Sequence, residues 1–66
     1  MFRVFHINFG NYADGEHGTV EEALEAGKRA GFEFSVRGGP VRMDRVVATW
    51  SPLYGTKRFD QGGGAR

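Results

Sequence analysis

The window from Thr19 to Gly31 constrains the fold more than any other part of the chain, because it has the pattern of an amphipathic helix with both ends specified. Thr19 is suited to cap the helix N-terminus, since its hydroxyl can accept a hydrogen bond from a backbone N–H of the first turn. Glu22 follows three residues later and can reach back to the Thr19 N–H, which completes a capping box. Gly31 suits the left-handed conformation that ends many helices. A chain of 66 residues with such a helix has room for a small sheet and no second layer.

The buried side of this helix consists mainly of small residues. Apolar or small side chains recur there at helical spacing: Val20, Ala23, Leu24, Gly27 and Ala30. A glycine in a helix interior costs roughly 1 kcal/mol relative to alanine, so Gly27 on this stripe needs a packing reason. We expect the helix backbone to lie close against a strand at Gly27.

Four segments outside the helix have the pattern of strands: residues 2–9, 32–37, 45–51 and a shorter segment at 56–59. Residues 32–37 alternate between apolar and polar side chains, which is typical of a strand with one buried face. The third segment is apolar on both faces from Val46 to Ala48, which favours a central place in the sheet.

The sequence also predicts a loop between two of these elements and a tail after the last one. Residues 10–18 predict a loop, with Asp14-Gly15 as its turn signal. Three consecutive glycines near the C-terminus predict a flexible tail over residues 61–66. We therefore expect one compact domain over residues 1–60, because a chain of this length has the size of a single domain.

Together the elements predict an α+β fold of order β-α-β-β, with a short fourth strand and one helix packed on one face of a small, mostly antiparallel sheet. The helix connects strands 2–9 and 32–37, so we expect these two strands to run parallel through a right-handed crossover. Strand 45–51 then lies between them, antiparallel to both, in a split β-α-β arrangement. The expected core is Phe5, Ile7, Leu24, Phe32, Phe34 and Val46 or Val47.

Several features of the sequence argue against a disulfide-bonded, membrane-spanning, secreted or metal-binding protein. The chain has no cysteine, so disulfides and thiolate metal sites are not expected. No apolar run approaches the length that spans a bilayer. The apolar N-terminus is short and interrupted by Arg3, which predicts a strand rather than a signal peptide, so we expect a cytoplasmic protein. His17 with Asp14 and Glu16 matches no zinc or calcium spacing, and we expect neither a metal nor another cofactor.

Residues with the usual catalytic patterns are missing from the sequence. Ser35 and Ser51 are the only serines, and neither lies in a nucleophile-elbow motif. Gly38-Gly39-Pro40 is not followed by the Lys-Ser/Thr pair of a phosphate-binding loop. One helix on one small sheet also offers little room for a catalytic cleft. We therefore expect a protein that is not an enzyme.

One helix can cover only one face of the sheet, and the other face is the first candidate site. We expect that face to be apolar, and edge strands 2–9 and 32–37 to have unpaired backbone groups. This predicts a small non-enzymatic interaction module that self-associates, as a dimer, or binds a protein partner. The residues expected to form that interface are Phe2, Val4, His6, Val47, Thr49 and Tyr54.

Charge suggests an alternative function. Residues 1–26 contain one arginine and five carboxylates, whereas residues 27–66 contain eight basic and three acidic residues. Such asymmetry can indicate a basic binding face, although the isoelectric point near 8.2 is below the strongly basic range of nucleic-acid-binding domains. The alternative is nucleic-acid binding through a basic surface with an aromatic side chain. Its expected residues are Arg37, Arg42, Arg45, Tyr54, Lys57 and Arg58.

Overall fold

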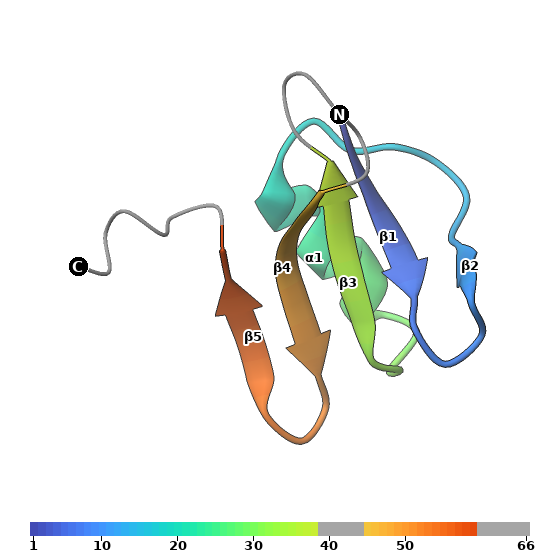
Figure 1. Cartoon of the computed structure of the whole chain (residues 1–66), viewed down its shortest axis with the longest axis vertical. Coiled ribbons are helices and arrows are strands. Elements are labelled where there is room, and N and C mark those ends of the chain that lie inside the picture. Colours follow the sequence, from blue (N-terminus) through green and yellow to red (C-terminus); the bar gives the residue numbers. More distant parts are fainter. Residues whose placement is uncertain (39–44, 60–66) are drawn as a thin grey trace.

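The computed structural model describes residues 1–38 and 45–59, in which five strands form one antiparallel sheet and one helix packs on one of its faces (Figure 1). The predicted α+β class with a helix on one face of a small sheet is confirmed. Arg42 and the predicted tail, residues 61–66, lie outside the described residues. The elements are β1 (Phe2–His6), β2 (Asn11–Tyr12), α1 (Val20–Lys28), β3 (Phe34–Gly38), β4 (Val46–Ser51) and β5 (Gly55–Arg58).

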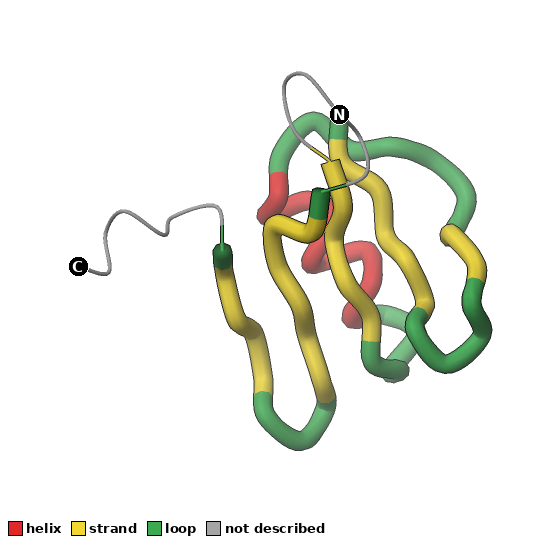
Figure 2. The backbone as a smooth tube through the Cα atoms, viewed as in Figure 1, coloured by secondary structure: helices red, strands yellow, loops and turns green. Residues whose placement is uncertain are grey.

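The order of the strands, β2-β1-β3-β4-β5, differs from the prediction. β1 and β3 are direct neighbours and run antiparallel, with Val4 opposite Val36. The predicted parallel pair and the split β-α-β arrangement are therefore wrong, as is the prediction that these two strands form the edges. The reason lies in residues 10–18, where β2 turns back beside β1 and is followed by a bridge between Phe2 and His17. The chain consequently enters α1 from the end of the sheet where β1 began, and α1 leads into an antiparallel β3 (Figure 2).

The ends of α1 follow the predicted signals. The Thr19 hydroxyl accepts a hydrogen bond from the Glu22 N–H at 3.1 Å. The Glu22 carboxylate in turn accepts from the N–H of Gly18 at 3.2 Å, one residue earlier than in the expected capping box. Gly31 has a φ of +81°, the left-handed conformation that a C-terminal glycine can adopt without strain.

The hydrophobic core lies between α1 and one face of the sheet. Phe34 is fully buried at its centre, and Trp50 stacks on it with ring centroids 5.5 Å apart. Gly27 lies directly over the Phe34 ring, and a Cβ atom on Gly27 would come within 2.5 Å of it. The predicted close contact between the helix and a strand at Gly27 is therefore confirmed. The buried core residues are Val4, Val20, Ala23, Leu24, Phe34, Val36, Val47 and Ala48.

Three residues of the predicted core do not lie among the buried core residues: Phe5, Ile7 and Phe32. β1 ends at His6, so Ile7 lies beyond the strand and is 42% exposed, and Phe32 precedes β3 and is 49% exposed. Phe5 faces away from α1, and Val4 is buried in its place. Apolar residues occupy both faces of β1, so alternation alone cannot show which set meets the helix.

A β-bulge in β4 explains why two consecutive residues there are buried. Arg37 lies opposite Val46 and Val36 lies opposite Ala48, so Val47 has no partner in β3. A bulge puts two residues of one strand against one residue of its neighbour. Val47 and Ala48 both enter the core as a result, whereas Val46 stays half-buried on the other face.

Candidate functional site: the open face of the sheet

The face of the sheet away from α1, here called the open face, is organised in rows across the strands. Tyr12 lies opposite Phe5, Phe5 opposite Ser35, Ser35 opposite Thr49, and Thr49 opposite Lys57. Residues that are directly opposite in antiparallel strands share a face. This row therefore crosses all five strands, with aromatic side chains on β2 and β1, hydroxyl side chains on β3 and β4, and a lysine on β5.

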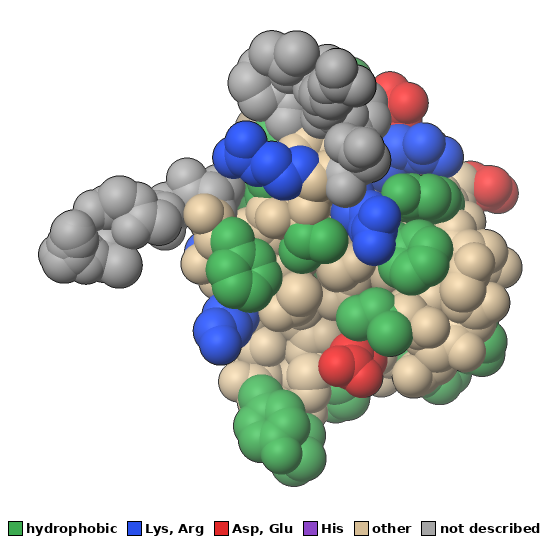
Figure 3. Space-filling view, viewed as in Figure 1, with side chains coloured by type: hydrophobic (Ala, Val, Ile, Leu, Met, Phe, Trp, Pro, Cys, Tyr) green, Lys and Arg blue, Asp and Glu red, His purple; other side chains and the backbone are tan. Residues whose placement is uncertain are grey.

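A second row on the open face contains Arg3, Arg37 and Val46, again by direct pairing across β1, β3 and β4. Figure 3 views the molecule from this side and shows Lys and Arg side chains and some Asp or Glu side chains interspersed with hydrophobic ones. The open face is therefore mixed in character. The expectation that Phe2, Val4 and Val47 make the uncovered face apolar is wrong, because Val4 and Val47 lie in the core under the helix and Phe2 packs against that core.

Two arginines of the open face lie over aromatic rings. The Cζ atom of Arg3 is 4.2 Å from the centroid of the Tyr12 ring, and that of Arg37 is 4.9 Å from the centroid of the Phe5 ring. The two rings meet edge to face, with centroids 5.0 Å apart. Each contact is a cation–π interaction. Together they hold two guanidinium groups on the surface of the sheet.

Arg3 and Arg37 are directly opposite each other in neighbouring strands. Like charges at such positions are destabilising. Within residues 1–38 and 45–59, neither guanidinium forms a salt bridge with a carboxylate. In the same part of the chain, the Nε atom of Arg37 is buried without a hydrogen-bond partner. The two guanidinium groups therefore repel each other, and their N–H groups can donate hydrogen bonds to an anion.

Carboxylates gather on the opposite side of the molecule. Glu21, Glu22 and Glu25 are exposed on α1, where they line a hollow together with Arg29. Arg58 lies on this side too, because its Nη1 atom is 3.2 Å from the Glu21 carboxylate. In the described part of the chain, the carboxylates of α1 therefore lie away from the open face, together with the basic residues Lys28, Arg29 and Arg58.

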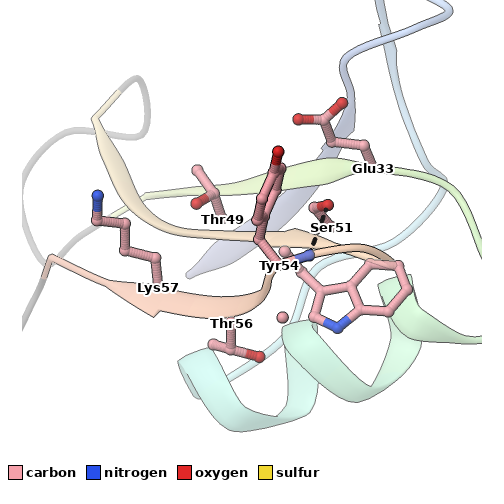
Figure 4. Close-up of a pocket in the computed structure, with 8 residues that line it drawn as sticks. Glu33, Thr49, Ser51, Tyr54, Thr56 and Lys57 are labelled. Carbon is pink, nitrogen blue, oxygen red and sulfur yellow. Dashed lines mark hydrogen bonds between the residues drawn. The ribbon is translucent and has the colours of Figure 1, made fainter.

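A hollow of about 360 Å³ lies where the β4–β5 hairpin meets the open face (Figure 4). The Ser51 hydroxyl accepts hydrogen bonds from the N–H groups of Leu53 and Tyr54, at 3.1 and 3.2 Å, and so shapes the turn. The Tyr54 side chain rises on the same side of the strands as Thr49 and Ser51. The lining residues are Glu33, Thr49, Trp50, Ser51, Tyr54, Gly55, Thr56 and Lys57.

The structure brings together part of the predicted nucleic-acid set. Arg37 and Lys57 share the open face, and Tyr54 stands at its rim. Arg45 is exposed just before β4. Arg58 was expected on the same surface, but it pairs with the helix instead, because it alternates with Lys57 along β5.

Three residues of the open face were not among the predicted site residues: Arg3, Phe5 and Tyr12. Alternation along the first strand could have grouped Arg3 with Phe5, and Phe2 with Val4 and His6. It identifies two sets of residues without showing which set faces solvent. Tyr12 could not be found that way, since its place depends on pairing with β1.

The six residues predicted for a protein interface do not form one surface. Val4 and Val47 are each only 2% exposed in the core, so they cannot contact a partner. Phe2 packs partly against the same core. His6 lies opposite Phe34 and so shares the helix side. Of this set, Thr49 lies on the open face and Tyr54 at its rim.

Residues 1–38 and 45–59 were also compared with the requirements of a metal site and of a membrane-spanning helix. No group of three or more histidine and acidic side chains could hold a metal ion there, and no helix is long and apolar enough to cross a membrane. No protein-family model, curated protein or solved structure matches the chain.

Proposed function

We propose that the protein is a non-enzymatic binding module that binds single-stranded nucleic acid along the open face of its sheet. The observation that carries this proposal is the pair Arg3 and Arg37, which face each other without a carboxylate partner in the described chain. A phosphate placed between them would relieve their repulsion and accept charge-assisted hydrogen bonds from both. The ligand supported by these residues is therefore anionic.

The aromatic groups favour a nucleic acid over a simple anion. Single-stranded nucleic acids are bound by basic surfaces on which aromatic rings or guanidinium planes stack against bases. The open face offers guanidinium planes at Arg3 and Arg37 and an exposed ring at Tyr54, which is 86% exposed. The carboxylates of α1 lie on the other side, where they would not repel a phosphate backbone bound to the sheet.

The sheet edges do not favour strand pairing with a second copy. β5 is one edge, and Lys57 and Arg58 lie on it. Two copies paired there would bring like charges together, and lysines on edge strands discourage such pairing. The other edge, β2, has only two residues.

Fluorescence anisotropy with labelled single-stranded RNA and DNA oligonucleotides at low salt tests the proposal. We expect micromolar binding that weakens steeply with salt, with a log–log slope of about −0.7 for each phosphate neutralised. Arg3→Ala and Arg37→Ala should each weaken binding several-fold and make the slope shallower by about that amount. Neither substitution should lower thermal stability much, since each removes a cation–π contact and also relieves the like-charge repulsion between the two arginines.

Arg29→Ala is the matched control, because it removes the same charge from the helix side of the molecule. It should leave the affinity unchanged. Absence of binding at low salt, or an equal loss of affinity in Arg29→Ala, would contradict the proposal.

Association with a second copy of the chain is the second candidate function. Phe9 and Phe32 are 61% and 49% exposed and contact each other edge to face, with centroids 5.3 Å apart. Ile7 is also exposed in the turn that contains Phe9. We define Ile7, Phe9 and Phe32 as the apolar end of the sheet, and its burial between two copies would remove exposed rings from water.

A further inference from the structure

We propose that the hollow at the β4–β5 hairpin is a base-recognition subsite that accepts a guanine, stacked on Tyr54 and read by the Glu33 carboxylate. This inference rests on the proposed function, because it assigns one position of the bound single strand. Base contacts give sequence preference, whereas phosphate contacts give affinity.

Tyr54 provides the stacking surface. The Ser51 hydroxyl accepts hydrogen bonds from the Tyr54 and Leu53 N–H groups, which fixes the turn beneath the ring. The ring is 86% exposed, so the fold does not use it for burial. An exposed ring on a hydrogen-bonded turn is available to stack on a base.

The hollow has room for a base beside this ring. Its volume of about 360 Å³ lies at the lower end of the range of small-ligand sites. Figure 4 shows Thr49, Ser51 and Glu33 on the same side of the strands as Tyr54, with Thr56 on the side of α1. A base that stacks on Tyr54 would therefore present its edge to hydroxyl and carboxylate groups.

Glu33 is the unusual residue of this subsite, because a carboxylate beside a basic surface would repel phosphate. Of the residues that line the hollow, Glu33 is the acidic one and Lys57 the basic one. Within the described chain, Glu33 is exposed and forms no salt bridge. Its two oxygens are free to accept hydrogen bonds.

Guanine matches this acceptor best among the common bases. Its N1–H and N2–H groups point in one direction on the Watson–Crick edge, which is accessible in a single strand, so both can donate to one carboxylate. Adenine and cytosine present a single amino group on that edge, and uracil presents one N–H. The Lys57 ammonium, which also lines the hollow, can donate to the guanine carbonyl or to a neighbouring phosphate.

Anisotropy titrations with a uridine-rich RNA that contains one guanosine, inosine, adenosine or cytidine at its centre test the subsite. Inosine removes only the 2-amino group of guanosine. We expect the wild type to bind the guanosine oligonucleotide about fivefold or more tightly than the inosine one. Glu33→Gln should abolish this preference and leave the affinity for oligouridine equal or higher, and Tyr54→Leu should weaken binding to every oligonucleotide.

Glu25→Gln is the control, since it makes the same charge change on the helix side and should preserve the guanosine preference. Equal affinity of the wild type for all four oligonucleotides would overturn the subsite while leaving the proposed function intact. A guanosine preference that survives in Glu33→Gln would overturn the role of Glu33. Absence of binding to any oligonucleotide would overturn the proposed function, and the subsite with it.

Discussion

Gly27 shows how one residue sets the distance between the helix and the sheet. It is buried on α1 above Phe34, whose ring occupies the position where a side chain would project. The helix therefore approaches the central strand more closely than any larger residue would allow. Glycine is unfavourable in a helix, so the close contact must outweigh its intrinsic cost.

Gly27→Ala is expected to destabilise the protein by about 1–3 kcal/mol, as over-packing does in well-packed cores. Helix propensity alone predicts the opposite, a gain of about 1 kcal/mol. Thermal unfolding followed by circular dichroism measures the difference. Gly18→Ala is the matched control, because the nearest atom to its Cβ would be 3.8 Å away. A melting temperature that stays constant in Gly27→Ala would contradict the close contact.

At the scale of elements, α1 is specified locally and β1 is not. The Thr19 hydroxyl bonds the Glu22 N–H, so the start of the helix depends on residues three positions apart. β1, in contrast, has Val4 on one side and Arg3 and Phe5 on the other. Whichever of these sets meets α1 is buried, and the turn into β2 determines where α1 begins.

Thr19→Ala is expected to cost about 1 kcal/mol, because it removes the acceptor for an N–H group of the first turn. Thr19→Ser keeps the hydroxyl and should retain most of the stability. Urea unfolding monitored by helix ellipticity compares the two variants. Equal stability of Thr19→Ala and wild type would mean that the cap contributes nothing to folding.

At the scale of the whole molecule, the fold gathers several basic side chains on the open face of the sheet. Arg3, Arg37 and Lys57 lie on the sheet, while Glu21 and its neighbours lie on the helix. The sequence contains almost equal numbers of basic and acidic residues, so its net charge of +1 does not reveal this cluster. A cluster of like charges raises the local concentration of ligands of the opposite sign.

Self-association through the apolar end would join two whole molecules. We expect sedimentation velocity at micromolar protein to show a mass that rises with concentration towards a dimer. Phe9→Ser with Phe32→Ser should return the protein to a monomer, because together they remove the two exposed rings in contact. Leu53→Ser is the control, as it removes an exposed apolar residue from the β4–β5 turn. A monomeric wild type at every concentration would contradict this candidate.

Short-range patterns were sufficient for the helix, its caps, the close contact at Gly27 and the approximate positions of four strands. Capping and helical periodicity involve residues only three or four positions apart, so they are visible in the chain itself. The strand order, the burial of Val4 rather than Phe5, and the rows of the open face were decided by tertiary structure. Pairing of β2 with β1 and the bulge at Val47 join residues that are distant in sequence or displaced in register. The stability of these pairings depends on which face of each strand packs against the helix. Alternation along β1, which has apolar residues on both sides, does not specify that face.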